Sequence, residues 1–118
     1  MGRPTFLVAE PMPHEGISAR KLVLEAARYN VITGYSGSDA LELLERFPRI
    51  DGLIVHSGIG DREFQKVIDE AAEKYPDCMI ILLSPGLTSM HEAAKFHLSS
   101  HDPKELLELL HERFGTPE

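Results

Sequence analysis

The amino-acid sequence predicts a doubly wound α/β sandwich, with helices on both faces of a five-stranded parallel sheet whose strand order is 2-1-3-4-5. Apolar runs and stretches of helical periodicity alternate along the chain, as repeated βα units require. One run, Met79–Leu83, is apolar at every position, which is typical of a strand covered on both faces and predicts the centre of the sheet. The 118 residues, 42% of them apolar, match one domain with one core, so residues 1–118 are expected to form a single unit.

The expected strands are short apolar or β-branched runs, bounded by residues that turn the chain. Pro11 and Pro13 stop the first run, and Asp51-Gly52 precede the third. The last run is weaker, and we expect it at an edge of the sheet. In chain order the strands are predicted at Thr5–Ala9, Val31–Thr33, Leu53–Val55, Met79–Leu83 and Phe96–Leu98.

The expected helices have apolar residues at helical spacing and capping residues at their starts. Ser36 stands three residues before Asp39 and is a predicted N-cap. Asp102 is another, because a first-turn proline and a capping-box glutamate follow it. The helices are predicted at His14–Tyr29, from Ser36 through Phe47, from Asp61 to Tyr75 and from Asp102 to Phe114.

The segment between the fourth and fifth strands is short for this architecture. Ten residues separate Ser84 from Lys95, and the Pro85-Gly86 pair disfavours a helix at the start of that segment. A full connecting helix does not fit there. We therefore expect the fourth helix to be short or absent.

The charge balance and the cysteine content exclude several classes of protein. Lys and Arg number 12 and Asp and Glu 19, so the net charge is −7, which disfavours binding to nucleic acid or to anionic membranes. No apolar run approaches the roughly 20 residues of a membrane span, and the N-terminus does not resemble a signal peptide, so we expect a cytoplasmic protein. Cys78 is the single cysteine, which excludes an internal disulfide and predicts a small buried apolar residue.

Any functional site is expected at the carboxyl ends of the strands, where doubly wound sheets bind their ligands. Glu10 follows the first strand, His56 the third and Ser84 the fourth. Parallel strands end at the same edge of a sheet, so these three side chains are expected to lie near one another.

The order and spacing of these segments resemble the receiver domain of two-component response regulators, which has a CheY-like, flavodoxin-like fold. The resemblance covers nearly the whole chain. In that family two acids after the first strand hold Mg²⁺, an aspartate at the end of the third strand accepts phosphate, a serine or threonine ends the fourth strand, and a lysine ends the fifth. The segments that carry the resemblance are TFLVAEPMP at 5–13, GYSGSDALELL at 34–44 and SSHDPKELLELL at 99–110.

The resemblance also identifies where this sequence departs from the family. It places Ala9-Glu10 at the acid pair, His56 at the phosphate acceptor and Ser99-Ser100 at the lysine-proline step, and only Ser84 matches its family role. One carboxylate makes a weak magnesium site, and an imidazole nitrogen is a poor ligand for this ion. We therefore expect weak or no Mg²⁺ binding, no other cofactor, and loss of aspartyl phosphorylation.

Two further features have a functional and a structural interpretation. Phe96 occupies the family's switch-aromatic position, and the alternative is a packing role alone. The last helix spreads its leucines more widely than one sheet face requires, so they are a candidate interface, and the alternative is that they are covered by their own domain. The interface candidates are Leu106, Leu109 and Leu110.

The histidines suggest a metal site as an alternative. A cluster of Glu10, His14, His56 and Ser84 would bind Zn²⁺ or titrate near neutral pH. The simpler interpretation of His56 is a side chain that fills the pocket and donates a hydrogen bond to Glu10 or to a backbone carbonyl.

Together these features predict an atypical receiver domain that is not an enzyme and acts by protein–protein contact in a two-component signalling system. Its partner would be another signalling protein, an attached output domain or a second copy in a homodimer. An alternative function is a flavodoxin-like module that binds a small ligand or a metal at Glu10, His56 and Ser84. Another interpretation is that the chain is the regulatory part of a longer protein, whose output domain would follow Pro117.

Overall fold

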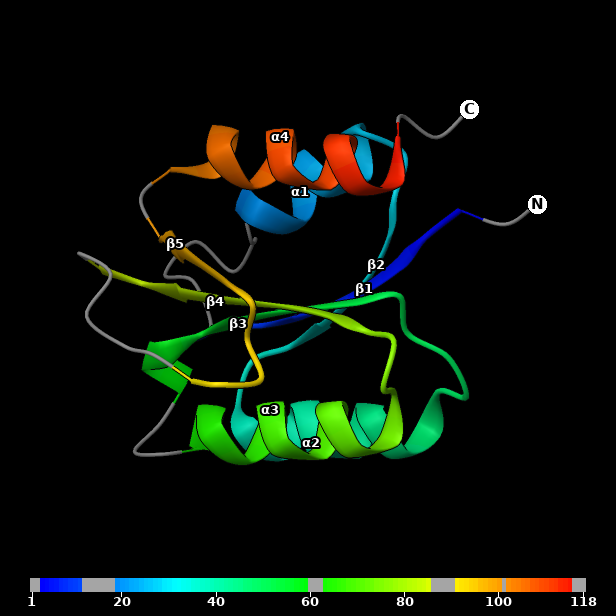
Figure 1. Ribbon diagram of the computed structural model, residues 1–118, viewed down its shortest axis with the longest axis vertical. Helices are drawn as coiled ribbons and strands as arrows, with labels where there is room; N and C mark the ends of the chain where they lie inside the picture. Colours follow the sequence, from blue (N-terminus) through cyan, green and yellow to red (C-terminus); the bar gives the residue numbers. More distant parts are fainter. Residues whose placement is uncertain (1–2, 12–18, 60–62, 86–90, 101, 116–118) are drawn as a thin grey trace.

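A single sheet of five parallel strands forms the middle of the molecule, in the predicted order β2-β1-β3-β4-β5 (Figure 1). The computed structural model describes residues 3–11, 19–59, 63–85, 91–100 and 102–115. Each connection from one strand to the next returns the chain to the same edge of the sheet, as parallel pairing requires. The strands are β1 (Thr5–Ala9), β2 (Asn30–Gly34), β3 (Gly52–His56), β4 (Met79–Ser84) and β5 (Phe96–Ser99).

Helices cover both faces of the sheet and complete the three layers (Figure 1). One face is covered by α1 (Ala19–Ala26) and α4 (Pro103–Phe114), and the other by α2 (Gly37–Arg46) and α3 (Glu63–Lys74). A short 3-10 turn, η1 (Ser57–Ile59), follows β3. The predicted doubly wound sandwich is therefore confirmed.

The buried residues form two clusters, one on each face of the sheet. Alternate residues of each strand point to opposite faces, so Phe6 and Val8 pack under α1 and α4, whereas Leu7 and Ala9 pack over α2 and α3. The ring of Phe6 makes edge-to-face contacts with Tyr29 and Phe114, at centroid distances of 5.1 and 5.2 Å. The contacts tie the first strand to the end of the last helix.

The prediction that Met79–Leu83 lies at the centre of the sheet is wrong. The central strand is β3, and β4 lies between β3 and the edge strand β5. All six residues of β4 are nevertheless buried, because helices cover both faces and a strand pairs with each side. A continuous apolar run indicates an interior strand, and it does not indicate which interior strand.

The predicted starts of two helices are confirmed by N-cap hydrogen bonds. The Ser36 side chain accepts a hydrogen bond from the Asp39 N–H at 3.0 Å, and the Asp102 carboxylate accepts one from the Glu105 N–H at 3.0 Å. The first helix ends earlier than predicted, at Ala26 rather than at residue 29. Arg28 has a φ of 70°, in the left-handed region, and this reverses the chain before β2.

The structure describes Pro85 and residues 91–95 of the connection from β4 to β5, and these residues contain no α-helix; Pro85 has 3-10 geometry. Residues 91–95 form a turn, in which the Ala94 N–H donates to the His91 carbonyl at 3.2 Å. The described residues thus agree with a short or absent fourth helix. The helices in the described ranges are too short or too polar for any of them to cross a lipid bilayer.

Candidate functional site at the carboxyl edge of the sheet

The residues that the sequence nominates for a site lie along one edge of the sheet. Glu10 directly follows β1, and His56, Ser84 and Ser99 are the last residues of β3, β4 and β5. The register pairs Ala9 with Val55 and Ser84 with Ser99, so the nominated residues stand at matching levels on neighbouring strands. The predicted clustering at the strand ends is therefore present in the backbone.

Glu10 forms a buried ion pair that the sequence analysis did not predict. Its side chain points to the same face as Val8, two residues earlier, and this is the face that α1 covers. From α1, the Arg20 guanidinium donates to the Glu10 carboxylate at 2.7 Å, and the two side chains are 18% and 7% exposed. A carboxylate so far removed from water needs a cationic partner, and the chain itself supplies one.

Arg20 also connects this carboxylate to the loop after the last strand. Its second guanidinium nitrogen donates to the Ser100 carbonyl at 3.2 Å. The Ser100 N–H in turn donates to the carbonyl of Ser84, at 3.2 Å. One side chain thus links β1, α1 and the loop between β5 and α4, and these elements carry two of the positions at which the sequence departs from the receiver pattern.

A signal for Arg20 was present in the sequence. Arg20 stands four residues before Leu24, which is fully buried, so both residues are on the helix face that packs against the sheet. A charged residue on that face needs a partner among the strand ends, and Glu10 is the acid found there. The cluster predicted from the sequence has His14 in this place, and His14 lies outside the described residues.

His56 is half-buried, and its ring accepts a hydrogen bond from the backbone. The Gly58 N–H donates to His56 Nδ1 at 2.8 Å, within the turn that follows β3. The sequence predicts that the His56 ring donates a hydrogen bond to Glu10 or to a backbone carbonyl. In the bond with Gly58 the ring accepts instead. The ring is therefore held by its own loop, and in the neutral imidazole the proton is on Nε2.

Of the remaining nominated positions, Ala9 and Ser84 are buried and Ser99 is half-buried. Ala9 is fully buried over α2 and α3 and has no ligating atom, so the first acid of the receiver pair has no counterpart. Ser84 is 1% exposed. Across the described ranges, no three His, Cys, Asp or Glu side chains come together in a group suited to a metal ion. A zinc site built with His14 falls outside those ranges.

The candidate interface on the last helix is mostly internal. Leu106 and Leu110 are buried in the cluster between α4 and the sheet, so the prediction that they form a docking surface is wrong for these two residues. Leu109 is half-buried against the same cluster. The wide spread of leucines around α4 is therefore explained chiefly by packing.

Phe96, at the predicted switch-aromatic position, is also half-buried. The Arg113 guanidinium carbon lies 5.8 Å from the centroid of its ring.

Cys78 lies just before β4, with its side chain largely shielded from water. Burial, with a smaller effect of the Asp51 carboxylate, raises the pKa of the Cys78 thiol from 9.0 to about 12. The thiol is within 3.8 Å of the Met79 carbonyl. These surroundings disfavour the thiolate, the reactive form of cysteine.

We expect folded Cys78 to react with iodoacetamide about a thousandfold more slowly at pH 8 than the same residue in the chain unfolded in urea, because a pKa raised by about three units lowers the thiolate fraction by that factor. The folded state retains this proton while the unfolded state loses it, so the contribution of Cys78 to stability declines from pH 9 to about 12. Mass spectrometry of timed samples measures the rates. Equal rates in the two states would contradict a protected thiol.

Comparisons with known proteins give matches by structure only. No protein-family model matches the sequence, and no curated protein matches it. A CheY-like receiver domain protein from Methanospirillum hungatei superposes with a TM-score of 0.79 at 16% identity, over 96% of this chain and 94% of that chain. A response regulator from Thermotoga maritima, solved in complex with Mg²⁺ and BeF, has a TM-score of 0.71 at 24% identity, over 92% and 97%.

A third similar structure is described as adenylate cyclase from Rhodopirellula baltica. Its TM-score is 0.78 at 17% identity, over 96% of this chain and 87% of that chain. Identities this low establish how the chain is folded and leave its chemistry to its own residues. The strand order, the helices on both faces and these superpositions together show that the chain has the CheY-like fold of response regulator receiver domains.

Proposed function

We propose that this chain is an atypical receiver domain that works in two-component signalling by protein–protein contact, and that it is not switched by phosphorylation of an aspartate. Its partner is a signalling protein or an attached output domain. The observation that carries the proposal is the buried ion pair between Glu10 and Arg20, at 2.7 Å. It engages the one carboxylate that remains at the position of the receiver acid pair.

The chemistry of acyl-phosphate formation supports this proposal. A carboxylate attacks a phosphodonor efficiently only when a hard cation neutralises the incoming phosphate oxygens. Here the acceptor position is His56, and the position of the first acid is Ala9. Mg²⁺ would have to displace the guanidinium of Arg20 from Glu10 while gaining few other oxygen ligands. With His56 as its last residue, β3 ends without a carboxylate that could attack the phosphodonor.

A fixed conformation follows from the same contacts. In a switchable receiver, as the family resemblance implies, cation and phosphate draw together the ends of the strands. In this chain Arg20 already joins Glu10 to the Ser100 carbonyl without either ligand. The domain therefore presents one surface to its partner at all times, and signal input comes from the amount or location of the protein rather than from its phosphorylation.

The test uses beryllofluoride, a phosphate mimic, with Mg²⁺ and a ¹⁵N-labelled sample of the full chain. We expect no saturable change in the backbone amide signals of His56 and Ser84, because neither a carboxylate acceptor nor a free magnesium ligand is available. A phosphorylatable receiver domain in the same buffer is the positive control. Saturable shifts that require both Mg²⁺ and beryllofluoride would overturn the proposal.

The ligand-binding alternative is separated by a second measurement. Thermal unfolding is recorded with Zn²⁺, with nucleotides and with flavins, since a ligand that binds the folded state raises the unfolding midpoint. Under our proposal the midpoint stays constant with all three. A rise that disappears in a Glu10→Gln variant would favour a ligand module at the carboxyl edge of the sheet.

A further inference from the structure

A cavity of about 300 Å³ lies at the amino ends of β4 and β5, at the opposite edge of the sheet from Glu10 and Ser84. It results from the unequal lengths of the two strands. β4 has six residues and β5 has four, and their pairing begins with Ile81 beside Phe96. No residue of β5 therefore stands beside Met79 or Ile80, and the cavity occupies this end of the sheet.

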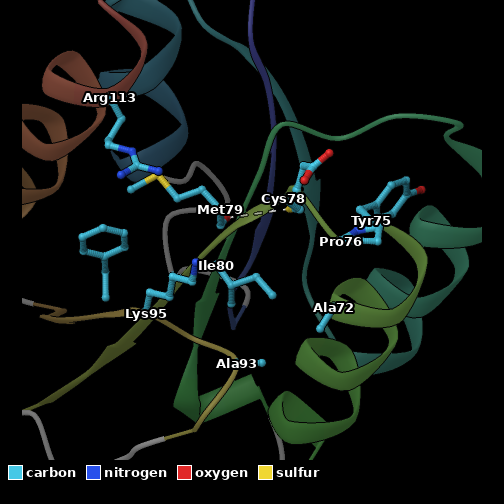
Figure 2. Close-up of a pocket in the computed structure, with 11 residues that line it drawn as sticks. Ala72, Tyr75, Pro76, Cys78, Met79, Ile80, Ala93, Lys95 and Arg113 are labelled. Carbon is cyan, nitrogen blue, oxygen red and sulfur yellow. Dashed lines mark hydrogen bonds between the residues drawn. The ribbon is translucent and has the colours of Figure 1, made fainter.

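The walls of the cavity come from four parts of the chain. Ala72 of α3 and Tyr75, which directly follows this helix, form one side, and Lys95 and Arg113 lie on the other side of β4 (Figure 2). Met79 and Ile80 also line the cavity, with their side chains on opposite faces of β4, and Phe96 lies on the same face as Met79. The described turn at residues 91–95 contributes Ala93 and Lys95 to the lining.

The charged side chains around the cavity are mostly cationic. Lys95 and Arg113 are both exposed cations, and neither forms an ion pair within the described residues. The one carboxylate in the lining is Asp77, so the lining carries an excess of positive charge in a protein whose net charge is −7. Between α2 and α3, by contrast, a smaller cavity balances Lys66 and Lys74 with two glutamates.

Arg113 is held in place over the cavity by an aromatic contact. Its guanidinium carbon lies 5.8 Å from the centroid of the Phe96 ring, a cation–π geometry. At this distance from the ring the guanidinium keeps donors for an anion. An arginine fixed in this way loses less side-chain entropy on binding than a freely rotating one.

We propose that this cavity binds a small organic anion, a carboxylate or phosphate carried on a compact apolar group. Lys95 and Arg113 would bind the anionic group by charge-assisted hydrogen bonds, and Phe96 and Met79, which lie on the face that α4 covers, would contact the apolar part. The volume is at the lower end of the range for small-molecule sites, which limits the ligand to a single ring or a short chain. The thiol of Cys78 takes no part, because burial keeps it protonated.

The experiment titrates the ¹⁵N-labelled full chain with phenyl phosphate, benzoate, inorganic phosphate and benzylamine. We expect saturable shifts at Lys95, Phe96 and Arg113 with the two aromatic anions. Inorganic phosphate should bind several-fold more weakly because it lacks the apolar part, and benzylamine should not bind because its charge is repelled. An acidic peptide is tested in parallel, to separate a free small molecule from a side chain on a protein partner.

Variants locate the site. Lys95→Gln and Arg113→Gln should each weaken phenyl phosphate binding roughly three- to tenfold, since each removes one charge-assisted contact. Lys104→Gln is the matched control, because Lys104 is an exposed cation at the other end of α4 and should leave the affinity unchanged. Thermal unfolding of each variant verifies that it is folded.

Several outcomes would overturn this inference. Shifts that rise linearly without saturation, or that persist in the Lys95→Gln/Arg113→Gln double variant, would mean that the cavity is not an anion site. Binding of the acidic peptide alone would replace the small molecule with a protein partner. The result is independent of the proposed signalling role, because Glu10 and His56 are at the other edge of the sheet.

Discussion

Replacing Arg20 with alanine should lower the free energy of unfolding by about 3 kcal/mol. The pair between Arg20 and Glu10 is mostly buried, so removing the guanidinium leaves a carboxylate with little access to water. The cost of such an uncompensated charge exceeds the attraction gained when the pair forms. Urea unfolding followed by circular dichroism gives the change, provided that the slope with denaturant stays constant.

Two comparisons show whether the loss arises from the buried charge. Arg46→Ala removes an exposed partner of Glu42, whose pair is 68% and 58% exposed, and should cost less than about 0.5 kcal/mol. The double variant Arg20→Met/Glu10→Leu removes both charges and keeps similar volumes, so it should recover most of the stability. If Arg20→Ala is no more destabilised than Arg46→Ala, the pair does not hold the edge of the sheet together.

Most of the fold was predictable because its determinants are local. The periodicity of apolar residues fixed the type and order of the elements, and side-chain oxygens at Ser36 and Asp102 fixed two helix starts. The short fifth strand was also visible from its weak apolar run. The position of β4 within the sheet was less accessible, because every interior strand buries both faces and has a similar composition.

The site was predictable in its location and only partly in its contacts. Strand ends are fixed by topology, so Glu10, His56 and Ser84 were correctly placed on one edge. The partner of Glu10 depends on how α1 lies across the sheet, which is a tertiary feature. Arginine is not a metal ligand and usually lies at the surface, so the sequence pattern points to His14 and not to Arg20.

The second large effect is expected when an aspartate is placed at the end of β3. A His56→Asp variant would place a second carboxylate beside Glu10, because β1 and β3 pair at Ala9 and Val55, the residues immediately before them. We expect this variant to bind Mg²⁺ poorly, because the guanidinium of Arg20 stays on Glu10. Adding Arg20→Gln removes that positive charge, and Mg²⁺ affinity measured by calorimetry should rise about tenfold or more.

The comparison between these variants tests whether Arg20 stands in for the metal. Arg20→Gln alone removes the cationic partner of the Glu10 carboxylate and should lower the unfolding midpoint. Mg²⁺ should raise the midpoint again, increasingly with its concentration, only when Asp also replaces His56. His56→Asp/Arg46→Gln is the control, because it loses the same charge at a distant exposed pair. Equal Mg²⁺ affinities with and without Arg20 would mean that the arginine merely packs at this edge. A gain specific to Arg20→Gln would mean that the chain carries its own cation where a switchable receiver depends on one from solution.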